Sequence, residues 1–281
     1  MIDELVQPVS VTITEGFADY VIVPTRLGMV AEVFYERAHV PDRVDLIQYR
    51  QVQGTCPGES CAPFYTLVLD LQPDLEVLLR QVDSNARYEI RRASQRDNVT
   101  IEHLDSTDIA TLGELWEAYD EFAASAGLSP ISRPLVRTYS GAGLLRITRA
   151  HDADRSCTVW HVYLRTRSRA RLLHSVSAFR SLGDTATKAL HGRVNRLLHW
   201  EDIRWFKEHG TTSMDFGGWY AGTTDKKRLA VNEFKKQFGG KLVCEYNCHR
   251  ALTARGKLIL AAERVLSAKH ILTRYLHPRR Q

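Results

Sequence analysis

Residues 211–240 read TTSMDFGGWYAGTTDKKRLAVNEFKKQFGG. The β-branched and apolar start of this stretch predicts a short strand over residues 211–216, which Gly217-Gly218 ends. Apolar residues then return at helical spacing and predict a helix over residues 225–238, which Gly239-Gly240 stops. A strand end, a glycine turn and a charged helix therefore follow one another directly.

The segments around this stretch predict two helices, three strands and a helix before it, and a strand and a helix after it. Three consecutive strands followed by one crossover helix predict a mixed, mostly antiparallel sheet, not the strict alternation of a doubly wound sheet. The segment 165–171 carries four arginines and is expected to be a solvated turn. The predicted helices cover residues 106–127, 132–143, 185–209 and 254–276, and the predicted strands cover residues 144–149, 157–165, 171–179 and 241–252.

The first hundred residues have a less regular pattern. Short β-branched or aromatic stretches, separated by Pro or Gly, predict strands there, and Pro73-Asp74 opens a helix. The basic segment NARYEIRRA follows at residues 85–93. We therefore expect two domains, residues 1–105 and residues 106–281. The predicted strands of the first domain lie at residues 20–23, 29–35, 44–52, 64–71 and 99–104.

Composition indicates a well-cored globular protein. Of the 281 residues, 44% are hydrophobic and 25% are charged, which excludes disordered and fibrous classes. The apolar runs are too short to span a bilayer, and the N-terminus lacks the apolar core of a signal peptide, so a cytoplasmic protein is expected. The net charge of +5 suits an anionic partner such as a phosphate, a nucleotide or tRNA, although many soluble proteins carry this charge without binding nucleic acid.

Five cysteines argue against a disulfide framework, because their number is odd. Cys56 and Cys61 form one close pair, and Cys244 and Cys248 form another. A zinc site would have to join the two pairs. The first spacing is wider than in common zinc motifs, and the second pair lies in a predicted strand. Free thiols, and no metal site, are the expected state.

The segment MDFGGWY at residues 214–220, followed by NEFKKQFGG at residues 232–240, is a distinctive pairing. It resembles Fem-type acyltransferases, the FemAB-like branch of the GNAT superfamily of N-acyltransferases. The resemblance implies an α+β fold with a GNAT-like, mixed and mostly antiparallel sheet flanked by helices. In that fold the fourth and fifth strands splay apart to admit the acyl group of the donor. Fem-type enzymes usually carry two such units, so residues 1–105 are expected to be a shorter, degenerate second unit or an accessory α/β unit.

Three residues are expected to carry the chemistry. Acyl transfer needs a neutral amine held against the activated carbonyl, and a stabilised oxyanion. By the resemblance, the ammonium of Lys235 would stabilise the charge that develops on this carbonyl, and Phe234 would pack against the end of the donor. Asp215, at the strand end, would orient the acceptor amine or accept its proton. From spacing alone, the same residues are a solvated helix charge, a core side chain and a turn-forming carboxylate.

Four residues are expected to bind the donor. Arg180 and Gly183 occupy the place of the GNAT pyrophosphate loop, between a strand and a helix N-terminus. Asp184 departs from the family pattern in this loop, because a carboxylate repels phosphate. Arg193 and Arg196, on the helix that follows, are expected to contact phosphate or a tRNA end, and the alternative is that they are surface charges.

The glycines and aromatic residues that follow the strand end, together with Trp200 on the helix before it, are expected to bind substrate. A glycine pair at a strand end permits close approach of a ligand to the backbone. The alternative is that the aromatic residues belong to the hydrophobic core. The expected substrate-binding residues are Trp200, Gly217, Gly218, Trp219 and Tyr220.

Together these features predict an N-acyltransferase that works by direct attack in a ternary complex, without a tightly bound cofactor. The preferred donor is aminoacyl-tRNA, and the acceptor is a peptide-like, cell-wall-precursor or small-metabolite amine. An acyl-CoA-dependent N-acyltransferase is the first alternative, and a non-catalytic module that binds RNA through a basic surface is the second. The basic helix over residues 254–276 fits peripheral membrane contact or a simple solubilising role.

Overall fold

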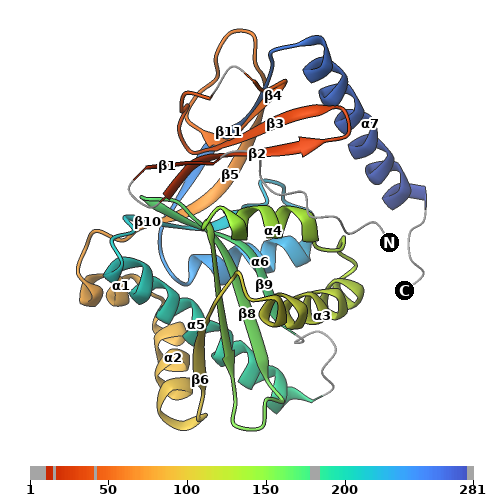
Figure 1. The fold of residues 1–281 in the computed structure, drawn as a ribbon. Helices are drawn as coiled ribbons and strands as arrows, with labels where there is room; N and C mark the ends of the chain where they lie inside the picture. The colour runs from red at the N-terminus through yellow and green to blue at the C-terminus, as the bar shows by residue number, and fades with distance from the viewer. Residues whose placement is uncertain (1–10, 15–16, 41–42, 178–183, 277–281) are drawn as a thin grey trace. The chain divides into compact units, whose positions relative to one another are not determined.

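The computed structural model describes residues 11–14, 17–40, 43–177 and 184–276 (Figure 1). The chain forms two compact units. Unit 1 comprises residues 1–64 and 245–281, and unit 2 comprises residues 65–244. These bounds differ from the expected domains 1–105 and 106–281, because the chain returns to unit 1 after completing unit 2. Whether residues 1–105 derive from a second GNAT unit stays a prediction.

Unit 1 is built on a sheet in which β1 pairs with β2, β2 with β3, β3 with β4, and β4 with the C-terminal half of β11. Only the β3–β4 pair is parallel. Helix α7 packs on β3 and β4, where Ile259 joins Val30 and Leu46 in a small apolar cluster. The elements are β1 (Val11–Thr14), β2 (Phe17–Thr25), β3 (Gly28–Phe34), β4 (Leu46–Val52), β11 (Lys241–Ala251) and α7 (Ala254–Leu276).

A disulfide in unit 1 corrects the expectation that the cysteines are free thiols. Cys61 and Cys248 are bonded across 187 residues of sequence. Cys56, Cys157 and Cys244 form no disulfide; Cys56 and Cys244 are exposed, and Cys157 is buried. The two close pairs seen in the sequence therefore do meet, but through one cysteine of each pair and through a covalent bond.

Unit 2 contains a six-stranded portion of sheet in the order β5-β10-β9-β8-β7-β6. All pairs are antiparallel except β9–β10. The expected fold class is confirmed: a mixed, mostly antiparallel sheet flanked by helices. The elements are β5 (Ser60–Asp70), α1 (Leu75–Gln81), α2 (Ser84–Arg96), β6 (Thr100–Leu104), α3 (Ile109–Ala126), α4 (Arg133–Gly141), β7 (Leu145–His151), β8 (Thr158–Arg165), β9 (Arg169–Ser177), α5 (Thr185–Glu208), β10 (Ser213–Gly218) and α6 (Lys226–Lys236).

The helices of unit 2 begin where the sequence provides caps. Asp108 accepts backbone N–H groups at the start of α3, and Asp225 does so for α6. Gly127 ends α3 in the left-handed conformation, with φ of 67°. Local capping chemistry therefore explains why the predicted bounds of these helices are close to the observed ones.

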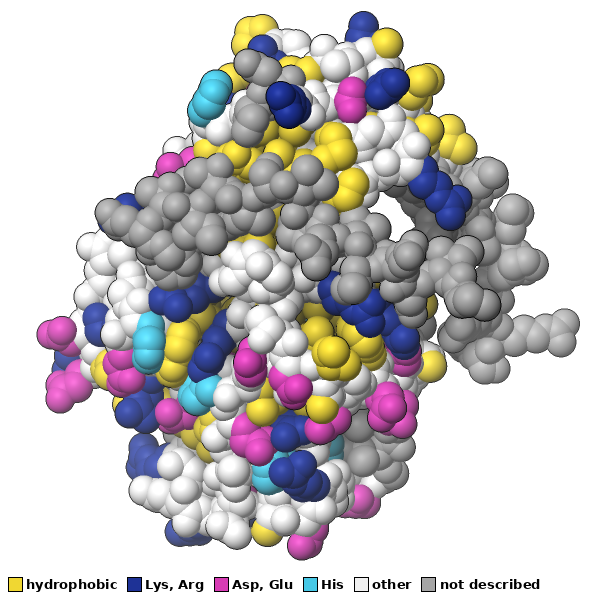
Figure 2. Space-filling view, viewed as in Figure 1, with side chains coloured by type: hydrophobic (Ala, Val, Ile, Leu, Met, Phe, Trp, Pro, Cys, Tyr) yellow, Lys and Arg dark blue, Asp and Glu magenta, His cyan; other side chains and the backbone are white. Residues whose placement is uncertain are grey.

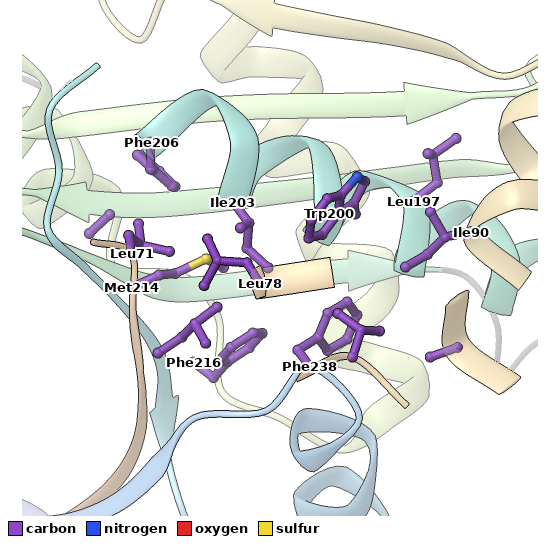
Figure 3. Close-up of a cluster of buried hydrophobic side chains, with 14 of the residues drawn as sticks. Leu71, Leu78, Ile90, Leu197, Trp200, Ile203, Phe206, Met214, Phe216 and Phe238 are labelled. Atoms are coloured by element: carbon purple, nitrogen blue, oxygen red, sulfur yellow. The ribbon is translucent and has the colours of Figure 1, made fainter. Parts of the chain in front are cut away.

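The core of unit 2 lies between α5, α1, α2 and the sheet (Figure 3). Trp200, Ile203 and Phe206 of α5 face Met214 and Phe216 of β10 in this core. Each is less than a tenth exposed, so truncating Phe206 to alanine is expected to cost about 3–5 kcal/mol. This packing holds α5 against β10 and so positions the turn at the end of that strand.

Candidate active site

The pairing of β9 with β10 ends early. These two parallel strands share three register pairs, and the last joins Asp215 to Arg171. Beyond that point β10 keeps its partner β5, through Gly218 and Thr66, and the N–H of Trp219 donates to the carbonyl of Tyr65 at 2.7 Å. Counted from β6, strands β9 and β10 are the fourth and fifth strands of this sheet. The separation expected between these two strands in a GNAT sheet thus begins after Asp215.

The turn that follows Asp215 requires glycine at position 217. Gly217 has φ of 74°, and a β-carbon there would lie 2.8 Å from the carbonyl oxygen of Leu172 on β9. A β-carbon essentially never approaches so closely, and the positive φ is unfavourable for other residues. The glycine allows the carbonyls of Gly217 and Gly218 to face the end of α6.

Lys235 reaches these two carbonyls from α6. Its Nζ donates to the oxygen of Gly218 at 2.6 Å and to that of Gly217 at 3.2 Å. The pKa of Lys235 is lowered to about 8, chiefly because burial disfavours its charged form; the charge of Asp215 opposes this shift, and that of Arg171 adds to it. A half-buried, oriented ammonium therefore lies where the two strands part.

Asp215 is a buried carboxylate that is held on several sides. Its Oδ2 accepts a hydrogen bond from Nη2 of Arg169 at 2.6 Å. Its Oδ1 accepts from the hydroxyl of Thr66 and from the N–H of Gly217, the latter at 2.7 Å. The side chain is fully buried and ion-paired. This geometry ties β10, β5 and the glycine turn together beneath Lys235. That Asp215 handles the acceptor amine stays a prediction.

Phe234 packs inward from α6. Its ring lies 5.5 Å from that of His199 and 5.6 Å from that of Phe238, and the guanidinium of Arg196 lies 5.0 Å above it. His199 is fully buried, and burial holds its pKa well below the usual range, so its ring is neutral. Phe234 thus forms part of the wall between the core and Lys235, and contact with a donor stays a prediction.

Of the aromatic residues predicted to bind substrate, the two tryptophans pack in or against the core, whereas Tyr220 is held by α6. Trp200 lies in the core of unit 2, 8% exposed. Trp219 packs against the edge of the same core, under Nζ of Lys236, which is 5.7 Å away. Tyr220 is held by Asn232, whose side chain bonds both its N–H and its carbonyl oxygen, at 3.2 and 2.9 Å. The sequence analysis did not predict a role for Asn232. Its position on the predicted helix, three residues before Lys235, was the one signal that could have indicated it.

The predicted donor-binding residues that the structure describes are ion-paired within the protein, and donor binding by them stays a prediction. Arg180 and Gly183 lie outside the described residues. Arg193 forms a two-point ion pair with Asp97, at 2.5 and 3.1 Å. Arg196 pairs with Glu89 at 3.0 Å. Both arginines therefore join α5 to α2 or its C-cap, and neither is an unpaired charge awaiting a phosphate.

The N-terminus of α5 also carries acidic groups. Asp184 caps the helix by accepting the N–H of Thr187 at 2.7 Å. Beside it, a cavity of about 430 Å³ is lined in part by Asp97, Asp152 and Asp154. These carboxylates disfavour a polyphosphate at that cavity.

The segment of four arginines is not uniformly solvated, which corrects the expectation for residues 165–171. Arg169 is 8% exposed and is the partner of Asp215. Arg165 donates to the carbonyl of His209 at 2.7 Å. The turn itself is shorter than expected, because β8 ends at Arg165 and β9 begins at Arg169.

One buried group of the described residues has side chains suited to a metal ion: His161, His199 and Asp202. The ring nitrogens of His161, however, already meet Asp202 at 2.7 Å and Asn195 at 2.9 Å. The hydroxyl of Tyr163 also donates to Asp202, at 2.9 Å. We interpret the group as a hydrogen-bonded network that joins α5 to β8. The expectation that the protein binds no metal stays a prediction.

The sheet, the parting strands and the lysine at their junction define an acyl-transfer fold of the N-acyltransferase type. Residues 80–236, more than half of the chain, match the family described as acetyltransferase (GNAT) domain. The chain belongs to this family and is an acyltransferase. No curated protein matches it significantly in sequence.

Solved structures share the fold at low identity. The structure of FemX has a TM-score of 0.58 and 13% identity, and covers 85% of this chain and 86% of that chain. The structure of L-PGS from Bacillus licheniformis has a TM-score of 0.53 and 12% identity, and the match covers 98% of this chain and 89% of that chain. The C-terminal domain (DUF2156) of a putative lysylphosphatidylglycerol synthetase from Agrobacterium fabrum has a TM-score of 0.50 and 13% identity, and the match covers 90% of this chain and 87% of that chain. The family match confirms the expected GNAT superfamily, and the fold is shared with the structure of FemX.

Within the described residues, none of the helices combines the length and the apolar character needed to cross a bilayer.

Proposed function

We propose that the protein transfers an aminoacyl group from aminoacyl-tRNA to an amine, by direct attack in a ternary complex. The observation that carries this proposal is the oriented ammonium of Lys235, 2.6 Å from the carbonyl of Gly218 where β9 and β10 part. A cation fixed at such a place can stabilise an oxyanion without reorganising during the reaction.

In the proposed step, the neutral acceptor amine attacks the ester carbonyl of the donor. A C–N bond forms, and the carbonyl oxygen becomes an oxyanion that accepts a hydrogen bond from the ammonium of Lys235. The intermediate then collapses, the C–O bond to the ribose breaks, and the leaving oxygen takes up the proton that the attacking nitrogen loses. The products are an amide and a tRNA with a free hydroxyl, so no protein nucleophile is needed.

Asp215 supports this step from below. Its contacts with Arg169, Thr66 and the N–H of Gly217 hold the turn whose carbonyls orient Lys235. Its negative charge also raises the pKa of Lys235 against the larger effect of burial, and so favours the ammonium form. We therefore propose that Asp215 positions Lys235.

The donor distinguishes this proposal from the alternative. The carboxylates of Asp184, Asp152 and Asp154 near the start of α5 disfavour a CoA pyrophosphate at that cavity, and the net charge of +5 suits an RNA. The description of the matched family as an acetyltransferase favours acyl-CoA, which remains the second candidate. Peptide-like, cell-wall-precursor and small-metabolite amines are the proposed acceptors, and the cytoplasm is the proposed location.

The test is a donor assay with purified protein. Radiolabelled aminoacyl-tRNAs, or acyl-CoAs with a thiol trap, are mixed with a panel of amines, and Lys235→Ala is run alongside. Transfer from aminoacyl-tRNA that is lost in the variant supports the proposal. Transfer from acyl-CoA alone refutes the tRNA donor and establishes the alternative. Salt-sensitive RNA binding without transfer from either donor would favour a non-catalytic RNA-binding module.

A further inference from the structure

The exposed face of α2 carries basic, aromatic and neutral polar side chains, and no acidic ones. The buried face of this helix consists of Ala86, Ile90 and Ala93. On the opposite face, helical spacing brings Tyr88, Arg91, Arg92 and Gln95 together. The four side chains are exposed, and Tyr88 is 53% exposed, which is high for a large aromatic residue. We call these four residues the α2 stripe.

The acidic residues of α2 and its caps cannot neutralise the stripe, because each is already engaged elsewhere. Asp83 accepts the N–H groups of Asn85 and Ala86 at the helix N-terminus. Glu89 pairs with Arg196, and Asp97 pairs with Arg193. Arg193 and Arg196 therefore neutralise the carboxylates nearest to α2, and the positive charges of Arg91 and Arg92 are not neutralised by them.

Several arginines elsewhere on the surface of unit 2 form ion pairs. Arg133 pairs with Asp120, Arg204 with Glu201 and Arg228 with Asp225. Arg91 and Arg92, among the described residues, have no such carboxylate partner. Lys and Arg side chains are visible along the lower left of the space-filling view, on the side where Figure 1 places α2 (Figure 2).

We propose that the α2 stripe binds the phosphodiester backbone of an RNA, with Tyr88 as a stacking surface for an unpaired base. Guanidinium groups recognise phosphate through paired N–H donors, and an exposed aromatic ring between them adds sequence-tolerant stacking. Nearby, Arg87 donates to the carbonyls of Leu79 and Arg80, which brings the exposed Arg80 to the same end of the helix. The inference rests on the proposed function only in taking this RNA to be the tRNA part of the donor.

The experiment measures binding of uncharged tRNA by filter retention over a range of salt concentrations. The variant is Arg91→Glu with Arg92→Glu, and the matched control is Arg133→Glu with Arg204→Glu, which makes the same charge change at two ion-paired positions of unit 2. Thermal unfolding establishes that both variants fold. We expect the stripe variant to bind at least about tenfold more weakly, and the slope of log affinity against log salt to fall by about 0.7–0.9 for each arginine. The control should keep most of its affinity and slope.

Three results would overturn the inference: wild-type protein that does not bind tRNA, equal loss in both variants, and no loss in either. Tyr88→Ala adds a second measurement, since it should weaken binding to a single-stranded oligonucleotide without changing the salt slope. The inference and the proposed function fail separately. tRNA binding through the stripe without any transfer would refute the function alone, and transfer with an unchanged KM for aminoacyl-tRNA in the stripe variant would refute the inference alone.

Discussion

The surroundings of Lys235 distinguish it from an ordinary surface lysine. An ammonium on an exposed helix would be one of many solvated charges, but here two backbone carbonyls hold it and burial lowers its pKa to about 8. Its neighbour Lys236 is exposed and pairs with Glu233. The two lysines are adjacent in sequence and have the same chemistry, so they form a natural pair for comparison.

Replacing Lys235 by alanine should lower kcat for transfer by about 10²–10³-fold, the loss typical of removing one oxyanion donor. Lys236→Ala should change kcat by less than about twofold, because its exposed side chain pairs with Glu233 and lies over the ring of Trp219, away from the carbonyls that hold Lys235. Both variants would be assayed at saturating donor and acceptor. Equal losses in the two variants would contradict a specific role for Lys235.

The pH dependence should report the lowered pKa. If the ammonium form is active, kcat at saturating acceptor is level well below pH 8 and falls as the pH rises through about 8, where Lys235 loses its proton. An ordinary lysine would hold its proton to about pH 10. In Lys235→Arg this falling limb should disappear, because guanidinium stays charged. A rate that instead rises through pH 8 would indicate a neutral Lys235 acting as base.

At the scale of elements, the end of β10 depends on Asp215. Asp215→Asn should destabilise the protein by about 3–5 kcal/mol, because the guanidinium of Arg169 would be left buried without its partner. The measurement is urea unfolding of Asp215→Asn, of Asp215→Leu, of Arg169→Met and of the double variant that combines the last two. A double variant more stable than either single variant would establish that the cost comes from burying one charge of the Arg169–Asp215 pair without the other.

The turn between β10 and α6 provides a second prediction. Gly217→Ala should lower kcat and stability together, since its β-carbon would meet the carbonyl oxygen of Leu172 at 2.8 Å. Gly210→Ala is the matched control, because Gly210 has a similar φ of 78° but nothing within 4 Å of the added carbon. Equal effects in thermal unfolding would show that the positive φ alone, without the clash, accounts for the loss.

Local signals predicted the elements better than they predicted the partners of side chains. The cap at Asp225 and the glycines after α6 lie next to the helix that they bound, so sequence alone placed it well. By contrast, Arg169 and Asp215 pair across 46 residues because β9 and β10 are in parallel register. Arg193 and Arg196 found partners on α2 and at its C-cap, a packing that spacing within α5 does not reveal. Charge pairing between elements was therefore the main unpredictable part of the site.

At the scale of the whole molecule, the disulfide is the most accessible feature to test. Reducing Cys61–Cys248, or replacing Cys61 by serine, should lower the stability of unit 1 by about 2–4 kcal/mol. Cys56→Ser should have no such effect, because Cys56 is free and exposed. Thermal unfolding with and without reductant measures both. An unfolding temperature that is insensitive to reductant would show that unit 1 does not depend on the bond.

The order in which the chain visits its two units has a consequence for biosynthesis. Unit 2 occupies one continuous segment, residues 65–244, whereas unit 1 lacks the end of β11, helix α7 and one of its bonded cysteines until the ribosome has passed residue 245. Unit 2 can therefore complete its core once residue 244 has left the exit tunnel, whereas the strands that precede it still lack their last neighbour. A released chain that ends at residue 244 should already protect unit 2 from proteases, and should leave residues 17–52 open to cleavage.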